Sequence, residues 1–126
     1  MRAIDTNVLV RLIARDDARQ VAAAERFIEG GAWVSVVVLV EALWVLDSVY
    51  QLKPEPLASA VEMLMDHREL VLQDGEAVAG ALVRFRKKPS LGFSDCLIVE
   101  LARRAGHGPV GTFDRDLGKI EGAEWI

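Results

Sequence analysis

The chain has 126 residues, is 52% hydrophobic and 27% charged, and carries a formal net charge of −4. This length suits a single domain, residues 1–126, and the composition excludes a disordered chain or a strongly basic nucleic-acid binder. The longest apolar run falls short of the ~18 residues of a membrane span, no secretory signal pattern opens the chain, and one cysteine allows no internal disulfide, so we expect a cytoplasmic protein without membrane association.

Short apolar runs alternate with longer stretches of helical periodicity, which is typical of an α/β fold with a mostly parallel sheet. The elements predicted in the first half are a strand at 2–4, helices at 7–14 and 17–29, a strand at 32–34 and a helix at 36–50. The second helix should bury Val21, Ala24, Phe27 and Ile28. The run at 36–50 is too long for a strand, and we predict a buried helix that Ser35 caps.

The second half repeats this alternation. The predicted elements are a helix opened by Pro54 and Pro56, a strand at 70–72, a helix at 74–88, a loop at 89–92, a helix capped by Ser94, a strand at 109–112, a short helix and a strand at 124–126. The helix opened by Pro54 and Pro56 fits the amphipathic template with Leu57, Ala60, Val61, Leu64 and Met65. Leu97, Ile98, Leu101, Ala102 and Ala105 should face inward from the helix that Ser94 caps.

Four acidic residues stand where a carboxylate is unexpected. Asp5 ends the first strand, Asp95 lies in the first turn of a helix, and Asp114 follows a late strand, with Asp116 two residues on. Taken singly, these aspartates could cap helices, complement a helix dipole or shape turns. Glu41 is the only charge in its apolar run, and a buried carboxylate needs an arginine or a metal ion.

Taken together, the four acids favour a metal site. The carboxyl ends of parallel strands meet at one edge of a sheet, where ligands bind, and each acid is expected near that edge. Clustered like charges repel unless a cation neutralises them, and oxygen ligands suit Mg²⁺ or Mn²⁺. Such a site can activate a water molecule against a phosphodiester. Setting the four aside leaves 15 acids against 15 Lys plus Arg, so the remaining protein is balanced.

Four ordered motifs carry a family resemblance. "AIDTNVLVRL", "VVVLVEALWVL", "GFSDCLIVELARRAG" and "VGTFDRDLGKI" resemble the signature of PIN-domain nucleases and, more narrowly, of VapC-like toxins of bacterial toxin–antitoxin pairs. The resemblance runs nearly end to end. It implies a three-layer α/β/α fold, with a central mostly parallel sheet of four to five strands and the site where the strand order reverses.

The resemblance also implies the chemistry. Asp5, Glu41, Asp95 and Asp114 match the family's acidic residues, Asp116 could share or replace the role of Asp114, and Thr6, Asn7 and Thr112 match supporting polar positions. The implied activity is Mg²⁺-dependent endonucleolytic cleavage of RNA. The implied partners are the RNA substrate, a cognate antitoxin that blocks the cleft and a second copy of the chain.

RNA would need cations near the acids. The candidates are Arg11, Arg84, Arg86, Lys87, Lys88 and Arg115. The basic residues between 84 and 88 could instead complement the C-terminus of the predicted helix that contains them.

Other functions explain the pattern less well. A receiver domain would need an adjacent acid pair after the first strand, and a haloacid-dehalogenase-type phosphatase would need D-x-D, but Thr6 and Asn7 follow Asp5. Both leave Glu41 without a role. A PIN nuclease of RNA processing that is not a toxin, or a module that binds RNA or protein without catalysis, remains open.

Overall fold

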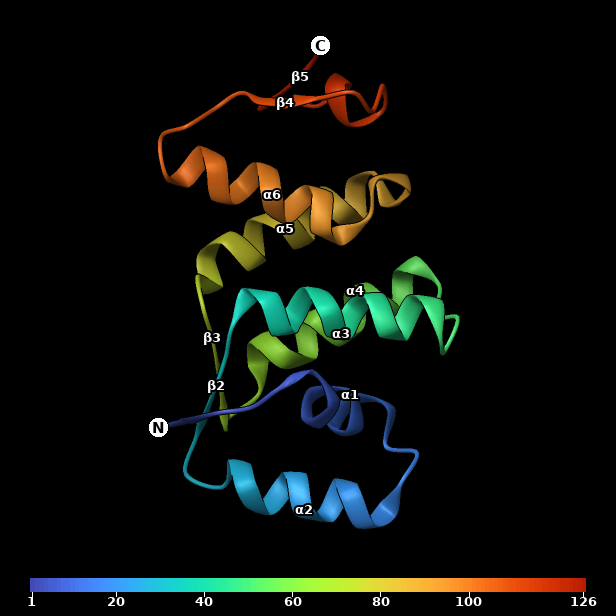
Figure 1. Ribbon diagram of the computed structural model, residues 1–126, viewed down its shortest axis with the longest axis vertical. Helices are drawn as coiled ribbons and strands as arrows, with labels where there is room; N and C mark the ends of the chain where they lie inside the picture. The colour runs from blue at the N-terminus through green and yellow to red at the C-terminus, as the bar shows by residue number, and fades with distance from the viewer. The chain divides into compact units, whose positions relative to one another are not determined.

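A computed structural model describes all residues from Met1 to Ile126, and the chain forms two compact units, Met1–Gly75 and Glu76–Ile126 (Figure 1). The single domain expected over residues 1–126 stays a prediction.

The N-terminal unit is built on a small parallel sheet whose strands β1, β2 and β3 lie in sequence order. Its elements are β1 (Arg2–Ala3), α1 (Thr6–Ala14), α2 (Ala18–Ile28), β2 (Ala32–Val34), α3 (Val36–Ser48), α4 (Pro54–Asp66) and β3 (Leu70–Leu72). Arg2 pairs with Ala32, and Ala32 pairs with Leu70. Parallel strands need helical crossovers, which the helices between the strands provide.

Helix α1 packs against both α2 and α3 in this unit. Leu9, Leu39 and Leu64 are among the side chains completely removed from solvent. Helix α3 is nevertheless buried on one side only: Val37 is 66% exposed and Trp44 67% exposed. The prediction of a buried helix was therefore wrong for this face, because a long apolar run does not reveal which side lacks a packing partner.

The C-terminal unit combines two helices with a two-stranded parallel sheet, β4 paired with β5. Its elements are α5 (Gly75–Lys87, which starts at the unit boundary), the 3-10 helix η1 (Pro89–Leu91), α6 (Phe93–Arg104), β4 (Val110–Thr112), the 3-10 helix η2 (Leu117–Lys119) and β5 (Ala123–Trp125). Phe85 of α5 and Phe93 of α6 meet edge to face, with ring centroids 6.0 Å apart, a geometry that aromatic rings prefer.

All five strands were predicted within one or two residues, and all of them pair in parallel. They form sheets of three and two strands rather than one sheet of four to five. The three-layer arrangement stays a prediction. None of the helices has the length and apolar character that crossing a membrane requires.

Several local predictions need correction. Phe27 and Ile98, expected to face inward, are 37% and 49% exposed, and Ala105 is exposed. Ser94 does not cap α6, because the helix already begins at Phe93. Gly92 holds the N-cap position with φ 81°, a backbone conformation that glycine adopts without strain. The expected loop at 89–92 contains the single 3-10 turn η1.

Candidate active site

Asp5 lies between β1 and α1, one residue beyond Ile4, at the start of the helix. Its backbone is extended, and its Oδ1 accepts a hydrogen bond from the amide nitrogen of Val8 at 3.1 Å. The carboxylate is therefore the N-cap of α1, as its position at a strand–helix junction predicted. Because the side chain is exposed and this bond uses one oxygen, capping leaves Asp5 able to ligate an ion.

Glu41 lies in the second turn of α3 and is joined to α1. Thr6 Oγ1 donates a hydrogen bond to Glu41 Oε2 at 2.6 Å, a contact that the packing of α1 on α3 makes possible. Glu41 is exposed rather than buried, so the argument that it needs a cation to offset burial does not hold. The bond from Thr6 orients the Glu41 carboxylate, and the predicted supporting role of Thr6 stays a prediction.

The carboxyl ends of the three N-terminal strands share one edge of the sheet. Asp5 follows β1, Ser35 follows β2 and Gln73 follows β3. Ser35 caps α3 through a bond from the amide of Val38 at 3.1 Å, and Gln73 Oε1 accepts from the amide of Val36 at 2.9 Å. Sequence reasoning missed Gln73, although a polar residue directly after a strand was a usable signal.

Asn7 faces a different feature of the same unit. It lines, together with Asp5 and Phe27, a pocket of about 390 Å³ along α1 and α2. Asn7 is exposed, and its predicted role in supporting the site stays a prediction.

Asp95 lies in the first turn of α6 and is half-buried. Burial raises the pKa of its carboxyl, and the negative charge of Asp114 raises this pKa further. The structure thus brings Asp95 and Asp114 close enough to repel each other. Burial, with a smaller effect from Asp95, also raises the pKa of the Cys96 thiol to about 11. Cys96 therefore stays protonated at neutral pH, and the ligands offered here are oxygens.

Asp114 is held rigidly after β4. Its Oδ1 accepts hydrogen bonds from the amides of Asp116 at 2.8 Å and Leu117 at 3.2 Å. Its own amide donates to Thr112 Oγ1 at 3.0 Å, and the predicted supporting role of Thr112 stays a prediction. Asp116 is exposed and makes no side-chain capping bond to η2. Because the charge of Asp114 is the one that raises the pKa of Asp95, we favour Asp114 over Asp116 as the acid that lies beside Asp95.

Most of the cations expected to bind RNA have contacts within the protein. Arg11 Nε donates to Gln20 at 2.6 Å, and its Nη1 donates to Tyr50 Oη at 2.9 Å. The guanidinium of Arg115 lies 4.5 Å from the ring centre of Trp125. Lys88 Nζ lies 3.5 Å from the carbonyl oxygen of Asp116. The RNA-binding role of these residues stays a prediction.

Glu100, which sequence reasoning missed, is the most deeply buried acid of the chain at 3% exposure. Arg84 Nε lies 2.7 Å from its Oε1, and Arg103 Nη2 lies 3.0 Å from its Oε2. Arg104 adds a longer ion pair at 3.5 Å. The spacing of Glu100 and the two following arginines was a usable signal, whereas Arg84 comes from the preceding helix. Burial alone would raise the pKa of Glu100, but hydrogen bonds and charges from Arg84 and Arg103 lower it overall.

The predicted acids divide two and two between the units: Asp5 and Glu41 in the first, Asp95 and Asp114 in the second. Neither unit by itself gathers three potential metal ligands. One shared cleft for all four acids stays a prediction. The donor chemistry of the second pair fits a divalent cation, because a carboxyl whose pKa is raised by burial and by a neighbouring carboxylate is stabilised in its charged form by such an ion.

The chain matches the family model described as PIN domain over residues 3–123. No curated protein matches it, and no solved structure does either. PIN domains are generally nucleases and typically use divalent metals, which agrees with the acidic character of the residues described above.

Proposed function

This chain belongs to the PIN domain family, and from that premise we propose that it is a Mg²⁺-dependent endoribonuclease. Within the family, we propose that it acts in the cytoplasm as the toxin of a VapBC-like toxin–antitoxin pair. The observation that supports the metal-dependent chemistry best is the half-buried carboxyl of Asp95, whose pKa is raised first by burial and then by the negative charge of Asp114. A charged carboxylate in these surroundings is destabilised, and a bound cation would relieve that cost.

The residues that would hold the ion are Asp95 and Asp114, with Asp5 as a further ligand and Asp116 as an alternative. Bound Mg²⁺ or Mn²⁺ would activate water and stabilise the negative charge that develops on the phosphodiester. The remaining work falls to the protein's own side chains. Thr6 keeps the Glu41 carboxylate in one direction, so that Glu41 can orient the attacking water and accept its proton.

Rigid placement of the ligands supports this role. The cap bond to Val8 restrains Asp5, and two backbone amides together with Thr112 restrain the Asp114 segment. Side chains fixed before substrate binds do not lose conformational freedom when it arrives, which lowers the barrier of the chemical step.

RNA cleavage with the purified protein tests this proposal. Cleavage should require Mg²⁺, stop with EDTA, and fall by at least ~100-fold in Asp5→Asn, because a metal ligand is removed. Asp66→Asn, which changes an exposed acid at the end of α4, is the matched control and should cleave like the wild type. Cleavage that persists in EDTA, or unchanged cleavage by Asp5→Asn, contradicts the assignment.

The toxin role has its own test. Expression of the wild type should arrest bacterial growth, and Asp5→Asn should not. We propose that the toxin is a homodimer. Co-expression of the protein encoded by the neighbouring reading frame should restore growth, because that protein forms a complex with the toxin. RNA cleavage in vitro without growth arrest would instead favour a PIN nuclease of RNA processing, and a chain that binds RNA without cleaving it would favour a silent module.

A further inference from the structure

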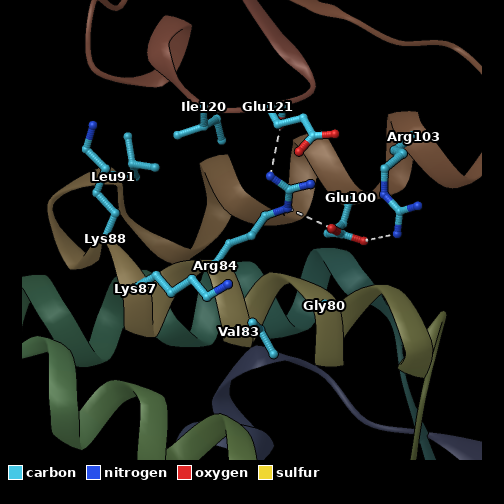
Figure 2. A pocket seen from close by; sticks show the side chains of 10 residues that line it. All are labelled: Gly80, Val83, Arg84, Lys87, Lys88, Leu91, Glu100, Arg103, Ile120 and Glu121. Carbon is cyan, nitrogen blue, oxygen red and sulfur yellow. Dashed lines mark hydrogen bonds and ion pairs between the residues drawn. The ribbon is translucent and has the colours of Figure 1, made fainter.

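The C-terminal unit contains a basic pocket whose lining includes neither Asp95 nor Asp114. It has a volume of about 460 Å³, within the range of roughly 300–1,000 Å³ that small-molecule sites occupy. Four cationic side chains line it: Arg84, Lys87, Lys88 and Arg103. Figure 2 shows them around the pocket with Glu100 and Glu121, the two acids of its lining.

The two arginines of the pocket are structural. Arg84 lies between Glu100, which accepts from its Nε at 2.7 Å, and the backbone oxygen of Glu121, which accepts from its Nη1 at 2.9 Å (Figure 2). Arg103 holds the other oxygen of Glu100 at 3.0 Å. The negative charge of Glu100 is therefore neutralised by these arginines, and Arg84 links α6 to the loop before β5 through hydrogen bonds.

The two lysines differ from the arginines because the ion pairs of the pocket involve the arginines alone. Lys88 is half-buried and reaches only a backbone oxygen, that of Asp116 at 3.5 Å, and Lys87 is exposed at the end of α5. Complementing the dipole of α5 accounts for a basic residue in its last turn. It does not account for two adjacent lysines on the wall of a pocket, where their charges are left for an anion.

The uncharged part of the lining is apolar. Val83, Leu91 and Ile120 contribute to the pocket wall, which offers a surface for a ribose or a base beside the charged groups. A phosphate attached to a nucleoside fits this combination better than a bare inorganic anion. The contact of Lys88 with the backbone of Asp116 also places the pocket rim next to the segment that carries Asp114.

We propose that this pocket binds one nucleotide unit of the RNA strand, with Lys87 and Lys88 contacting its phosphate. Arg84 would keep the pocket in shape through its bonds to Glu100 and to the backbone of Glu121. The inference rests on the proposed ribonuclease function and deepens it, because it gives the strand a binding site in addition to the metal-binding acids. Sequence reasoning treated Arg84 and the lysines alike as RNA contacts. The geometry separates them into a structural arginine and two ligand-binding lysines.

RNA binding measured without cleavage tests this subsite. Fluorescence anisotropy of a short labelled single-stranded RNA in EDTA should show that Lys87→Gln/Lys88→Gln binds roughly five- to tenfold more weakly than the wild type. The slope of log affinity against log salt should become shallower by about 0.7 for each phosphate that the variant no longer neutralises. Arg19→Gln/Lys53→Gln removes the same charge from exposed positions of the N-terminal unit and should change binding far less.

One further variant and a small ligand complete the test. Lys87→Arg/Lys88→Arg should bind RNA like the wild type, because the charge is kept. Unchanged RNA affinity in the glutamine variant overturns the subsite even if the wild type cleaves RNA. Lysine-dependent binding without any cleavage would support the subsite while the nuclease proposal fails. The alternative is a pocket that binds adenosine monophosphate instead of RNA, and the effect of this ligand on the melting temperature of the wild type and the glutamine variant distinguishes the two cases. If it raises the melting temperature of the wild type alone, while both proteins bind RNA equally well, the pocket is a site for free nucleotides and the proposal is overturned.

Discussion

Helix α6 carries two acids in opposite surroundings. Asp95, in the first turn, is half-buried and lies near another carboxylate, so its pKa is raised. Glu100, five residues later, is almost completely buried, but three arginines surround it and its pKa is lowered. Burial of an acid therefore does not identify its role. The decisive feature is whether the protein supplies the compensating cation, as it does for Glu100, or leaves that cation to come from solution, as we propose for Asp95.

Removing the acid that has arginine partners should have the largest effect on stability. Glu100→Ala leaves the guanidinium groups of Arg84 and Arg103 without their counter-ion and should destabilise the protein by about 3 kcal/mol. Urea unfolding of the variant and the wild type measures this difference. A cost below about 1 kcal/mol would mean that the arginines are satisfied without Glu100, and the contrast between the two acids would lose its basis.

Glycine at position 80 of α5 tests how tightly the protein encloses the Glu100 carboxylate. A Cβ at Gly80 would lie 2.6 Å from Glu100 Oε2, so Gly80→Ala should destabilise by about 1–3 kcal/mol, although alanine is the better helix former. Gly75→Ala is the matched control, because a Cβ at Gly75 meets nothing within 4 Å. Thermal unfolding should show a lower melting temperature for Gly80→Ala alone; equal stability of both variants would contradict the close packing.

The two acids should have opposite effects on the pH dependence of stability. Because the folded pKa of Glu100 is lowered, its contribution is present above its ordinary pKa and is lost as pH falls through the folded value. Because the folded pKa of Asp95 is raised above 3.8, the native state holds its proton longer than the unfolded state. Asp95 thus costs stability as pH rises from 3.8 through the raised value.

Unfolding free energies of Asp95→Asn, Glu100→Gln and the wild type in EDTA, measured from about pH 3 to pH 7, separate these contributions. Relative to the wild type, Asp95→Asn should gain stability as pH rises from 3.8 through the raised pKa of Asp95. Glu100→Gln should lose stability relative to the wild type as pH rises from the lowered folded pKa of Glu100 to its ordinary value. Parallel curves for the two variants would remove the electrostatic difference between the two ends of α6.

The places of three candidate acids in the fold could be predicted, because these residues lie near strand ends and helix starts. Asp5 and Asp114 lie two residues after the ends of their strands, and Asp95 lies in the first turn of a helix, so chain position alone indicated them as candidates. The exposure of Glu41 could not be predicted, because the apolar run around it includes Val37 and Trp44, which face solvent. The Thr6–Glu41 bond spans 35 residues and depends on how α1 packs on α3.

Glu100 shows the limit of sequence reasoning more clearly. Its partner Arg84 is 16 residues away on another helix, and the basic run around Arg84 resembled a nucleic-acid contact. Burial and ion pairing appear only once α5 and α6 are placed together. The division of the strands into sheets of three and two likewise depends on tertiary pairing, since the apolar pattern of a strand does not reveal its neighbours.

The melting temperature with and without divalent metal tests the central claim most directly. In EDTA at neutral pH, Asp95→Asn should melt slightly above the wild type, because the cost of burying the charged carboxylate and the repulsion with Asp114 are both gone. With Mg²⁺ or Mn²⁺ the wild type should gain stability by mass action, about 2.7 kcal/mol at a hundred times the dissociation constant, and Asp95→Asn should respond much less. An Asp95→Asn protein that gains as much stability from metal as the wild type would contradict the account.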